Sequence, residues 1–224
     1  SSASFTESVK VALTGSEKDA KIYFTTDGSI PCKKSKLYKK PLEFDQSTEL
    51  QFIAIRNDGT SGFINKSSYL KAKYGISLVN APDEKYNGGG PLGLVDGATG
   101  SIDFADGHWS GFNGTNLEAI VDLGSIKELS KFQVNFNEST KSWIFRPREV
   151  EYAVSEDGKN FRPIFTKTFE NPESESELLL QVPCSYSCKA RYVKVVATNF
   201  GKIPEWHMAR GEPAWLFADE IIAQ

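Results

Sequence analysis

Apolar and polar residues alternate along most of the chain, in short runs separated by turn residues. In the first third, Val9, Val11 and Leu13 alternate with polar residues, and residues 50–55 carry apolar side chains on both faces. Period-2 runs that end at Asp-Gly or Asn-Asp-Gly turns predict β-strands. Five short strands without a helical period predict a small Ig-like sandwich over residues 1–76.

The pattern is interrupted between residues 75 and 90, where Pro82 and three consecutive glycines predict a connection. Beyond it, alternating runs occupy residues 117–123, 132–136, 150–154 and 192–197, and the last run is AWLFADEII. About eight strands over roughly 140 residues predict a jelly-roll sandwich over residues 77–224. The predicted fold class is therefore all-β, with two sandwiches in series.

Composition and charge exclude some classes of function. The formal net charge is −3 and the pI is about 5.6, so no global basic field attracts nucleic acid or anionic lipid. No apolar run approaches the roughly 18 residues that a membrane-spanning helix needs. The only methionine is Met208, so we expect the chain to be a processed or excised piece of a longer protein.

The residue types do not favour catalysis. A nucleophile triad is poorly supported, because the chain has two histidines, His108 and His207, and no Gly-x-Ser-x-Gly turn. Glycoside hydrolysis needs two carboxylates on either side of a sugar ring. Asp219 and Glu220 are adjacent on a predicted strand, so we expect their side chains to point to opposite faces and not to form that pair. We expect no active site in these residues.

The cysteines leave two interpretations open. Cys184 and Cys188 in PCSYSC either close a small disulfide loop in an oxidising compartment or stay reduced as small apolar residues. Cys32 has no obvious partner.

Two sets of short sequence motifs resemble known families. The words YFTTDGSIP, LYKKPLEF and ELQFIAIRNDG resemble the small C-terminal sandwich that follows the catalytic barrel in chitobiases and related β-hexosaminidases. Trp109 and the words VDLG, VSEDG, ARYV and DEI, in this order, resemble the discoidin (factor V/VIII type C) domain in its bacterial form, carbohydrate-binding module family 32.

These resemblances imply a non-catalytic accessory region of a secreted glycoside hydrolase of the β-N-acetylhexosaminidase type. They imply an extracellular, periplasmic or cell-surface location. The implied partners are a glycan with a terminal hexose or N-acetylhexosamine and the catalytic domain of the same protein. The alternative is a structural spacer without a sugar site, and a third class is protein or phospholipid binding through the loop around residues 143–146.

A sugar site needs an aromatic face for the pyranose ring and polar groups for its hydroxyls. Trp109 matches the structural tryptophan of the discoidin pattern, and Trp215 and Phe217 alternate on the last strand, so we expect these three in the core. Candidates for a binding rim lie in predicted loops, where the alternative is a side chain that packs the loop itself. These candidates are Trp143, Phe145, Arg146, Phe112, Asn113, Trp206, His207 and Arg210. Galactose-binding relatives often carry histidine where this chain has Ser110, so we expect another ligand or an altered pocket.

The discoidin resemblance also implies one structural calcium ion. By position, Asp96 and Glu220 match its carboxylate ligands, and a carbonyl near Ala218 matches a third. The alternative for each carboxylate is to cap a turn.

Overall fold

The computed structural model describes residues 2–15 and 19–224, which divide into two compact units, Ser1–Lys71 and Ala72–Gln224. We call these unit 1 and unit 2. The boundary expected after residue 76 falls inside strand β8 (Gly75–Leu78), which pairs with β10 of unit 2. Ala72 and Tyr74 already pack in the core of unit 2, so the boundary moves to residue 71.

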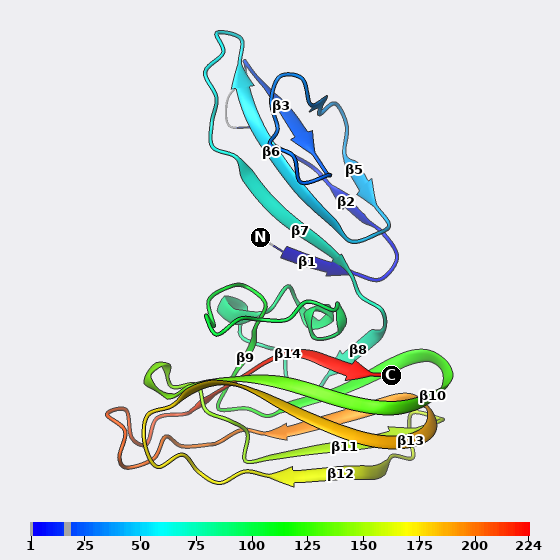
Figure 1. Ribbon diagram of the computed structural model, residues 1–224, viewed down its shortest axis with the longest axis vertical. Helices are drawn as coiled ribbons and strands as arrows, with labels where there is room; N and C mark the ends of the chain where they lie inside the picture. The colour runs from blue at the N-terminus through cyan, green and yellow to red at the C-terminus, as the bar shows by residue number, and fades with distance from the viewer. Residues whose placement is uncertain (1, 16–18) are drawn as a thin grey trace. The chain divides into compact units, whose positions relative to one another are not determined.

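Unit 1 is a sandwich of a five-stranded and a two-stranded sheet (Figure 1). The larger sheet has the order β1-β7-β6-β3-β4, and the smaller one pairs β2 with β5. Its strands are β1 Ser2–Phe5, β2 Val9–Val11, β3 Ala20–Thr25, β4 Lys36–Leu37, β5 Leu42–Phe44, β6 Thr48–Arg56 and β7 Asn65–Lys71. The core of the unit is formed by Val11, Leu13, Phe24 and Leu50, which come from both sheets and from the segment after β2.

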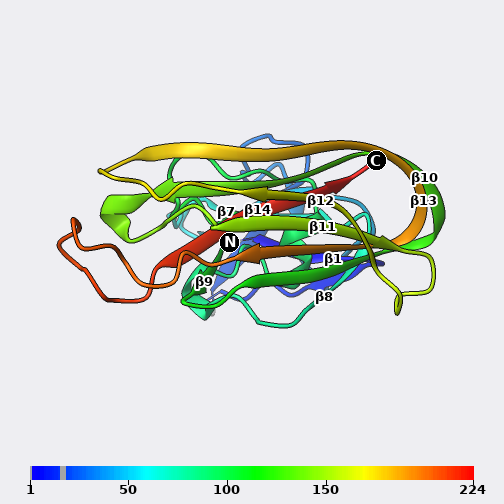
Figure 2. The same ribbon diagram turned by 90° about the horizontal axis from the view of Figure 1, so that it is seen from below.

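Unit 2 is built on two long antiparallel strands, β10 (Leu117–Ser139) and β13 (Glu177–Thr198). They pair from Leu117↔Ala197 to Ser139↔Glu177, with two shifts in register on the way. The first part of β10 also pairs with β8, and its last part pairs with β14. Both long strands therefore pass from one layer of the sandwich to the other, turning together at one end (Figure 2).

The remaining elements complete the two layers in the strand order β12-β11-β13-β10-β14-β9. They are β9 Ser110–Asn113, β11 Glu149–Ser155, β12 Arg162–Thr168 and β14 Trp215–Ala223, with 3-10 turns η1 Glu84–Tyr86, η2 Pro91–Val95 and η3 Thr140–Ser142. Within residues 2–15 and 19–224, no helix is long and apolar enough to span a bilayer. The all-β class predicted from the sequence is confirmed.

The two predicted strands at 117–123 and 132–136 are one strand in the structure. The turn signal at Asp122 does not end the strand, because β10 pairs with β13 both before and after it. The Asp122 carboxylate accepts the Gly124 N–H at 2.8 Å where the ladder is irregular. Gly124 has a φ of +81°, which glycine adopts without a Cβ penalty. A turn signal inside a long ladder thus produces a bend instead of a break.

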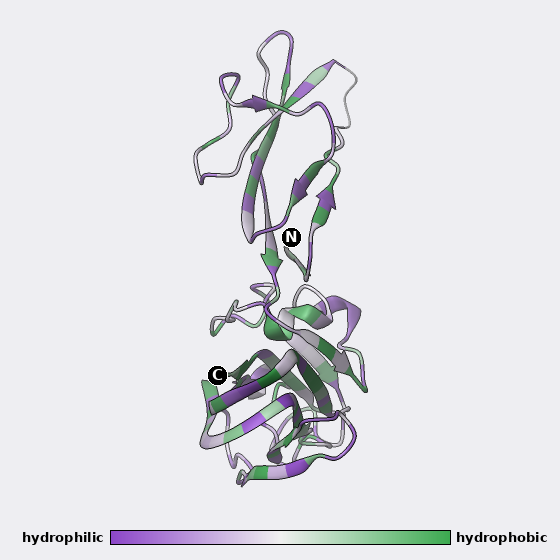
Figure 3. Cartoon of the chain, turned by 90° about the vertical axis from the view of Figure 1, so that its right-hand side faces the viewer, coloured by the Kyte–Doolittle hydropathy of each residue, from purple (hydrophilic) through white to green (hydrophobic). Residues whose placement is uncertain are grey.

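The layers of unit 2 enclose an apolar core, as the alternation of hydropathy along its strands shows (Figure 3). Trp109 is buried as expected, and its indole N–H donates to the Ser101 carbonyl at 3.0 Å. The ring packs beside Ile144 and Phe217 in a smaller aromatic cluster next to the main core.

Gly100 lies against the Trp109 ring, and a Cβ built on it would lie 2.2 Å from Trp109 Cε2. We expect Gly100→Ala to destabilise unit 2 by about 1–3 kcal/mol, because the buried indole has no room to move. The melting temperature should fall by roughly 2–10 °C. Tryptophan fluorescence measures this, since Trp109, Trp143, Trp206 and Trp215 all lie in unit 2. Gly75→Ala is the control, because no atom lies within 4 Å of its Cβ position.

Candidate functional site

Two loops of unit 2, residues 143–148 and 199–214, pack on each other around a small apolar cluster. Phe145 is at its centre, and its ring lies 4.8 Å from that of Phe200, centroid to centroid. Ile203 and Ala214 complete the cluster. These loops are therefore folded on an interior of their own, and their outer side chains are held in place from below.

Trp143 is the most unusual residue of these loops. Its side chain is 38% exposed, and its φ of 67° lies in the left-handed region, which is unfavourable for a bulky residue. Two backbone hydrogen bonds hold this conformation: the Trp143 N–H donates to Thr140, and its carbonyl accepts the Trp215 N–H at 2.8 Å. Strained backbone of this kind is frequent at ligand-binding positions.

Trp206 is the second exposed aromatic residue of the loops. Its side chain is 37% exposed, and its ring centroid lies 6.3 Å from that of Phe145. The indole N–H donates to the Pro172 carbonyl at 2.8 Å, which fixes the ring to the connection between β12 and β13. The indole N–H of Trp206 is thus bound within the protein, while part of its ring remains exposed to solvent.

Asn113 lies near Trp143 because Trp215 pairs with Asn113 on one side and with Ile144 on the other. Asn113 pairs in register with Trp215, and Trp215 forms a parallel bridge with Ile144 on its other side. Two strand spacings separate Asn113 from Ile144, about 10 Å. We call Trp143, Trp206 and the exposed Asn113 the loop rim.

A buried carboxylate anchors the loop rim. The Glu138 side chain is fully buried and accepts hydrogen bonds from the Arg146 backbone N–H, the Arg146 guanidinium and the Ser176 hydroxyl. Burial raises the pKa of Glu138, but the hydrogen bonds from Arg146 and Ser176 outweigh it, so the pKa lies below its usual value. The ionised carboxylate joins the loop of Trp143 to the segment that holds Trp206.

Three of the eight candidate rim residues are wrong as ligand-facing groups, because their side chains are buried. Phe112 lies in the main core, Phe145 is the centre of the loop cluster, and His207 packs its ring 6.0 Å from that of Phe145. His207 Nδ1 also accepts the Ala209 N–H at 3.0 Å, so it serves the loop itself. These are the loop-packing alternatives stated above.

The other candidates divide into two groups. Arg146 is committed to Glu138. Arg210 is exposed and lies at 3.9 Å from the Glu205 carboxylate, near Trp206 in sequence. Together with the loop rim, Arg210 remains a candidate for contact with a ligand.

Sequence reasoning missed the polar residues that hold the loops together. Besides Glu138 and Ser176, the buried Asn199 side chain donates to the carbonyls of Phe112, Thr115 and Ala214. No local sequence signal marks Glu138 or Asn199 as buried, because distant segments of the chain cover them.

The loops carry more acidic than basic side chains. Residues 138–148, 170–177 and 199–214 contain five Lys or Arg and seven Glu, a net of −2. Three of the cations also face carboxylates: Arg146 faces Glu138, Lys141 lies at 3.2 Å from Glu175, and Arg210 approaches Glu205. An anionic ligand would meet a net negative charge here.

The candidate calcium residues lie at a different place, between β14 and the loop after η2. Between Val134 and Phe136 of β10, the register of β14 advances by three residues, from Ile221 to Ala218, which is a bulge at Asp219 and Glu220. Glu220 accepts the Gly97 N–H at 3.1 Å and Asp219 accepts the Gly100 N–H at 2.7 Å.

The expectation that Asp219 and Glu220 point to opposite faces is therefore wrong, because the bulge turns both carboxylates toward residues 97–100. Both are buried, so no sugar ring fits between them. Burial, together with the nearby charges of Asp96 and Asp219, raises the pKa of Glu220 to about 8. The Asp96 carboxylate caps its own turn by accepting the Ala98 N–H.

Among the residues that the structure describes, no three His, Cys, Asp or Glu side chains form a metal-binding group. Asp96 and Glu220 would supply two carboxylates, and further oxygens would have to be backbone carbonyls or water. Ala218 is fully buried in β14, between β9 and β10. Carboxylate oxygens such as those of Asp96 and Glu220 are the ligands that a hard cation such as Ca²⁺ prefers.

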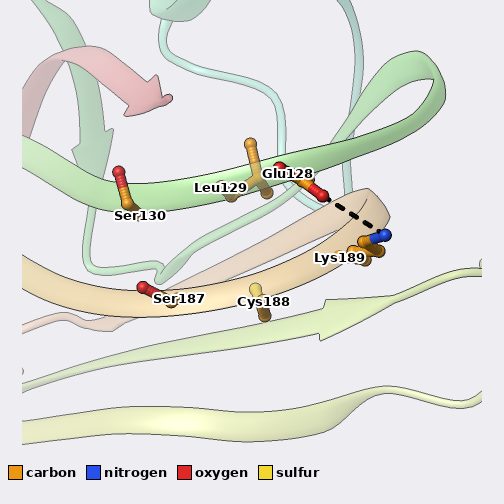
Figure 4. A pocket seen from close by; sticks show the side chains of 6 residues that line it. All are labelled: Glu128, Leu129, Ser130, Ser187, Cys188 and Lys189. Carbon is orange, nitrogen blue, oxygen red and sulfur yellow. Dashed lines mark ion pairs between the residues drawn. The ribbon is translucent and has the colours of Figure 1, made fainter.

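Another hollow, of about 430 Å³, lies where β10 and β13 turn (Figure 4). Its lining is Glu128, Leu129, Ser130, Ser187, Cys188 and Lys189, with Glu128 and Lys189 paired at 3.2 Å. It has no aromatic face for a sugar. The thiols of Cys184 and Cys188 are both free, and burial raises the pKa of each. The disulfide alternative is not present in this structure.

Two family models match the chain. The chitobiase/beta-hexosaminidase C-terminal domain matches residues 1–66, and the F5/8 type C domain matches residues 78–211, more than half of the chain. No curated protein matches the chain.

Solved structures similar to the chain include carbohydrate-binding modules of three bacteria. A chitosan-binding module of a Paenibacillus sp. IK-5 chitosanase/glucanase is 14% identical, with 68% of this chain and 96% of that chain covered and a TM-score of 0.43. A Clostridium perfringens family-32 module in complex with GalNAc-beta-1,3-galactose is 20% identical, with coverage of 67% and 94% and a TM-score of 0.45. A Streptococcus pneumoniae fucose-binding module is 19% identical, with coverage of 66% and 89% and a TM-score of 0.41. The ligand in each case is that of the module named.

Removing the Glu138 charge tests its role in the loops. We expect Glu138→Gln to lower the free energy of unfolding by about 2–3 kcal/mol at pH 7, because Arg146 loses its partner. The folded pKa of Glu138 is depressed, so its contribution is present above the ordinary value of 4.5 and is lost as the pH falls through the folded pKa. The difference between the two proteins should shrink below that pH in denaturant titrations.

The matched control is Glu175→Gln, whose pair with Lys141 is exposed to solvent. Exposed pairs contribute at most about 1 kcal/mol. Equal losses in the two variants would contradict a special role for Glu138.

Proposed function

Because the chain belongs to the F5/8 type C domain family through residues 78–211, preceded by a chitobiase/beta-hexosaminidase C-terminal domain, we propose that unit 2 binds a glycan at the loop rim. Both domains are non-catalytic accessory modules. The observation that carries the proposal is Trp143, a half-exposed tryptophan held in a left-handed conformation by hydrogen bonds with Thr140 and with Trp215 at the start of β14. Such strain persists only when the surrounding structure imposes it, and strained residues are frequent at binding sites.

The chemistry of the loop rim suits a sugar. The exposed part of an indole stacks on the C–H face of a pyranose, and two such rings give a contact of low conformational entropy cost. The Asn113 amide offers both a donor and an acceptor to sugar hydroxyls, and the Arg210 guanidinium offers donors. The Glu138 anchor keeps these groups in place before the ligand arrives.

The proposed ligand is a neutral terminal hexose or N-acetylhexosamine. The net charge of −2 on the loops disfavours uronates, sialates and sulfated sugars, because like charges repel. The match of residues 1–66 supports a β-N-acetylhexosaminidase as the whole protein, with its catalytic domain as the partner of this region. An extracellular, periplasmic or cell-surface location follows from the ligand proposed.

A calcium ion bound by Asp96 and Glu220 is a second part of the proposal. The support is the proximity of the two carboxylates, which adds to burial in raising the pKa of Glu220, and the bulge that turns Glu220 toward Gly97. The ion would lower this repulsion and fix the loop after η2 on β14. It would take no part in sugar chemistry.

We expect the chain to bind glycans that end in neutral hexoses or N-acetylhexosamines on an array, and Trp143→Ala to weaken binding at least about five-fold. Loss of an aromatic stacking partner removes about 1–3 kcal/mol, a factor of roughly 5–150. Trp206→Ala should also weaken binding. The control is Met208→Ala, an exposed apolar residue of the same loop.

Absence of binding to any terminal sugar would favour the structural-spacer alternative. Tighter binding to sialylated or sulfated glycans than to neutral ones would contradict the proposed ligand class.

Calcium should stabilise unit 2. A carboxyl whose folded pKa is raised from 4.5 to about 8 is protonated more in the folded than in the unfolded state, so without a cation stability falls as the pH rises between these values. Saturating calcium should remove that decline and add about 2–3 kcal/mol at pH 8. Thermal melts with calcium or a chelator measure both effects.

Glu220→Gln should melt without this pH dependence and without a response to calcium, whereas Glu212→Gln, on an exposed loop, should behave as the wild type. A wild type that melts identically with calcium and with chelator at pH 8 has no such site.

A further inference from the structure

The net charge of −3 is distributed unevenly between the two units. Unit 1 contains 11 Lys or Arg and 8 Asp or Glu, a net of +3, whereas unit 2 contains 15 and 21, a net of −6. Unit 1 is therefore basic within an acidic chain. The global charge considered above concealed this difference.

The positive charge of unit 1 is concentrated in the segment KKSKLYKK, residues 33–40, which contains no acidic residue. Its five lysines are Lys33, Lys34, Lys36, Lys39 and Lys40, and all are exposed. Among the described residues, none of these five forms an ion pair within 4 Å. The segment therefore presents a net charge of +5 to solvent.

Large apolar side chains are exposed on the same unit. Phe63 is 93% exposed and Ile30 is 71% exposed, and Ile64 beside Phe63 is 40% exposed. A single exposed apolar residue is ordinary, but a bulky group with nearly its whole surface in water is costly to leave uncovered.

Two contacts bring these residues and the lysines to one region. Gln51 donates to the Gly28 carbonyl at 3.2 Å and pairs in register with Lys66, which follows Phe63 by three residues. The turn that precedes Ile30 is thus fixed to β6 opposite Lys66, close to where β7 begins after Phe63 and Ile64 of the β6–β7 connection.

The second contact is at the other end of that connection. A Cβ built on Gly59 would lie 3.7 Å from Lys33 Nζ, so the lysine segment reaches the same loop. We call Ile30, Lys33, Lys34, Phe63 and Ile64 the basic-apolar patch.

We propose that the basic-apolar patch binds the surface of an anionic phospholipid bilayer. Exposed lysines attract acidic headgroups, and a protruding phenylalanine with isoleucines beside it enters the boundary between headgroups and acyl chains. A soluble polyanion would use the lysines but gain little from Ile30 and Phe63. The apolar side chains therefore favour a lipid surface over a charged polymer.

This binding is peripheral and reversible. It acts through unit 1 and is independent of the glycan proposed for unit 2, so either proposal can fail without the other. A region with both activities would hold its protein at a membrane through unit 1 while unit 2 binds a glycan.

The test is sedimentation of the full 224-residue chain with vesicles of equal parts phosphatidylglycerol and phosphatidylcholine, compared with pure phosphatidylcholine. We expect binding to the anionic vesicles only, weakened by salt above roughly 0.5 M. Lys33→Glu with Lys34→Glu should reduce the affinity at least about 20-fold, since each lysine contributes about five-fold. Phe63→Ser should reduce it about ten-fold or more.

The matched controls are in unit 2. Lys131→Glu with Lys159→Glu makes the same charge change, and Met208→Ala removes an equally exposed apolar side chain. Both should bind as the wild type. Absence of vesicle binding, equal binding to neutral vesicles, or unchanged binding of Phe63→Ser alongside equal affinity for soluble polyphosphate would each overturn the proposal.

Discussion

The ladder between β10 and β13 is the constraint on which unit 2 depends. It runs through both layers and ends at the pair Ser139↔Glu177. The next residues continue it, because Thr140 and Ser176 exchange hydrogen bonds through backbone and hydroxyl groups. Glu138, one residue before the end, then takes up Arg146 and Ser176. The loop that carries Trp143 thus follows directly from the end of this ladder.

The all-β class and the two sandwiches could be predicted because alternation reports directly which face of a strand is buried. What alternation does not report is where a strand bends. Asp122-Leu-Gly has the composition of a turn, and only pairing with β13 on both sides of it makes it a bend within one strand. The same applies to the domain boundary, since β8 belongs to unit 2 through its distant partner β10.

The candidate site was less predictable for a related reason. Trp143 and Phe145 are two residues apart in one polar loop, yet one is half exposed and the other has no exposed surface. The difference arises from the loop of residues 199–214, which covers Phe145 and not Trp143. Asp219 and Glu220 were expected on opposite faces of the strand, but a bulge turns both carboxylates to one side. Long-range contacts decide both cases, and short-range patterns do not contain them.

The left-handed backbone at residue 143 sets stability against surface chemistry at a single position. Glycine would adopt a φ of 67° without the penalty of roughly 1–2 kcal/mol that a side chain incurs. The residue that the backbone favours, glycine, therefore has no ring, whereas a tryptophan at this φ is strained. Any variant selected for thermal stability alone would tend to lose the indole at this position. At position 143, therefore, the residue that gives the more stable protein and the residue that gives the better binding surface are different.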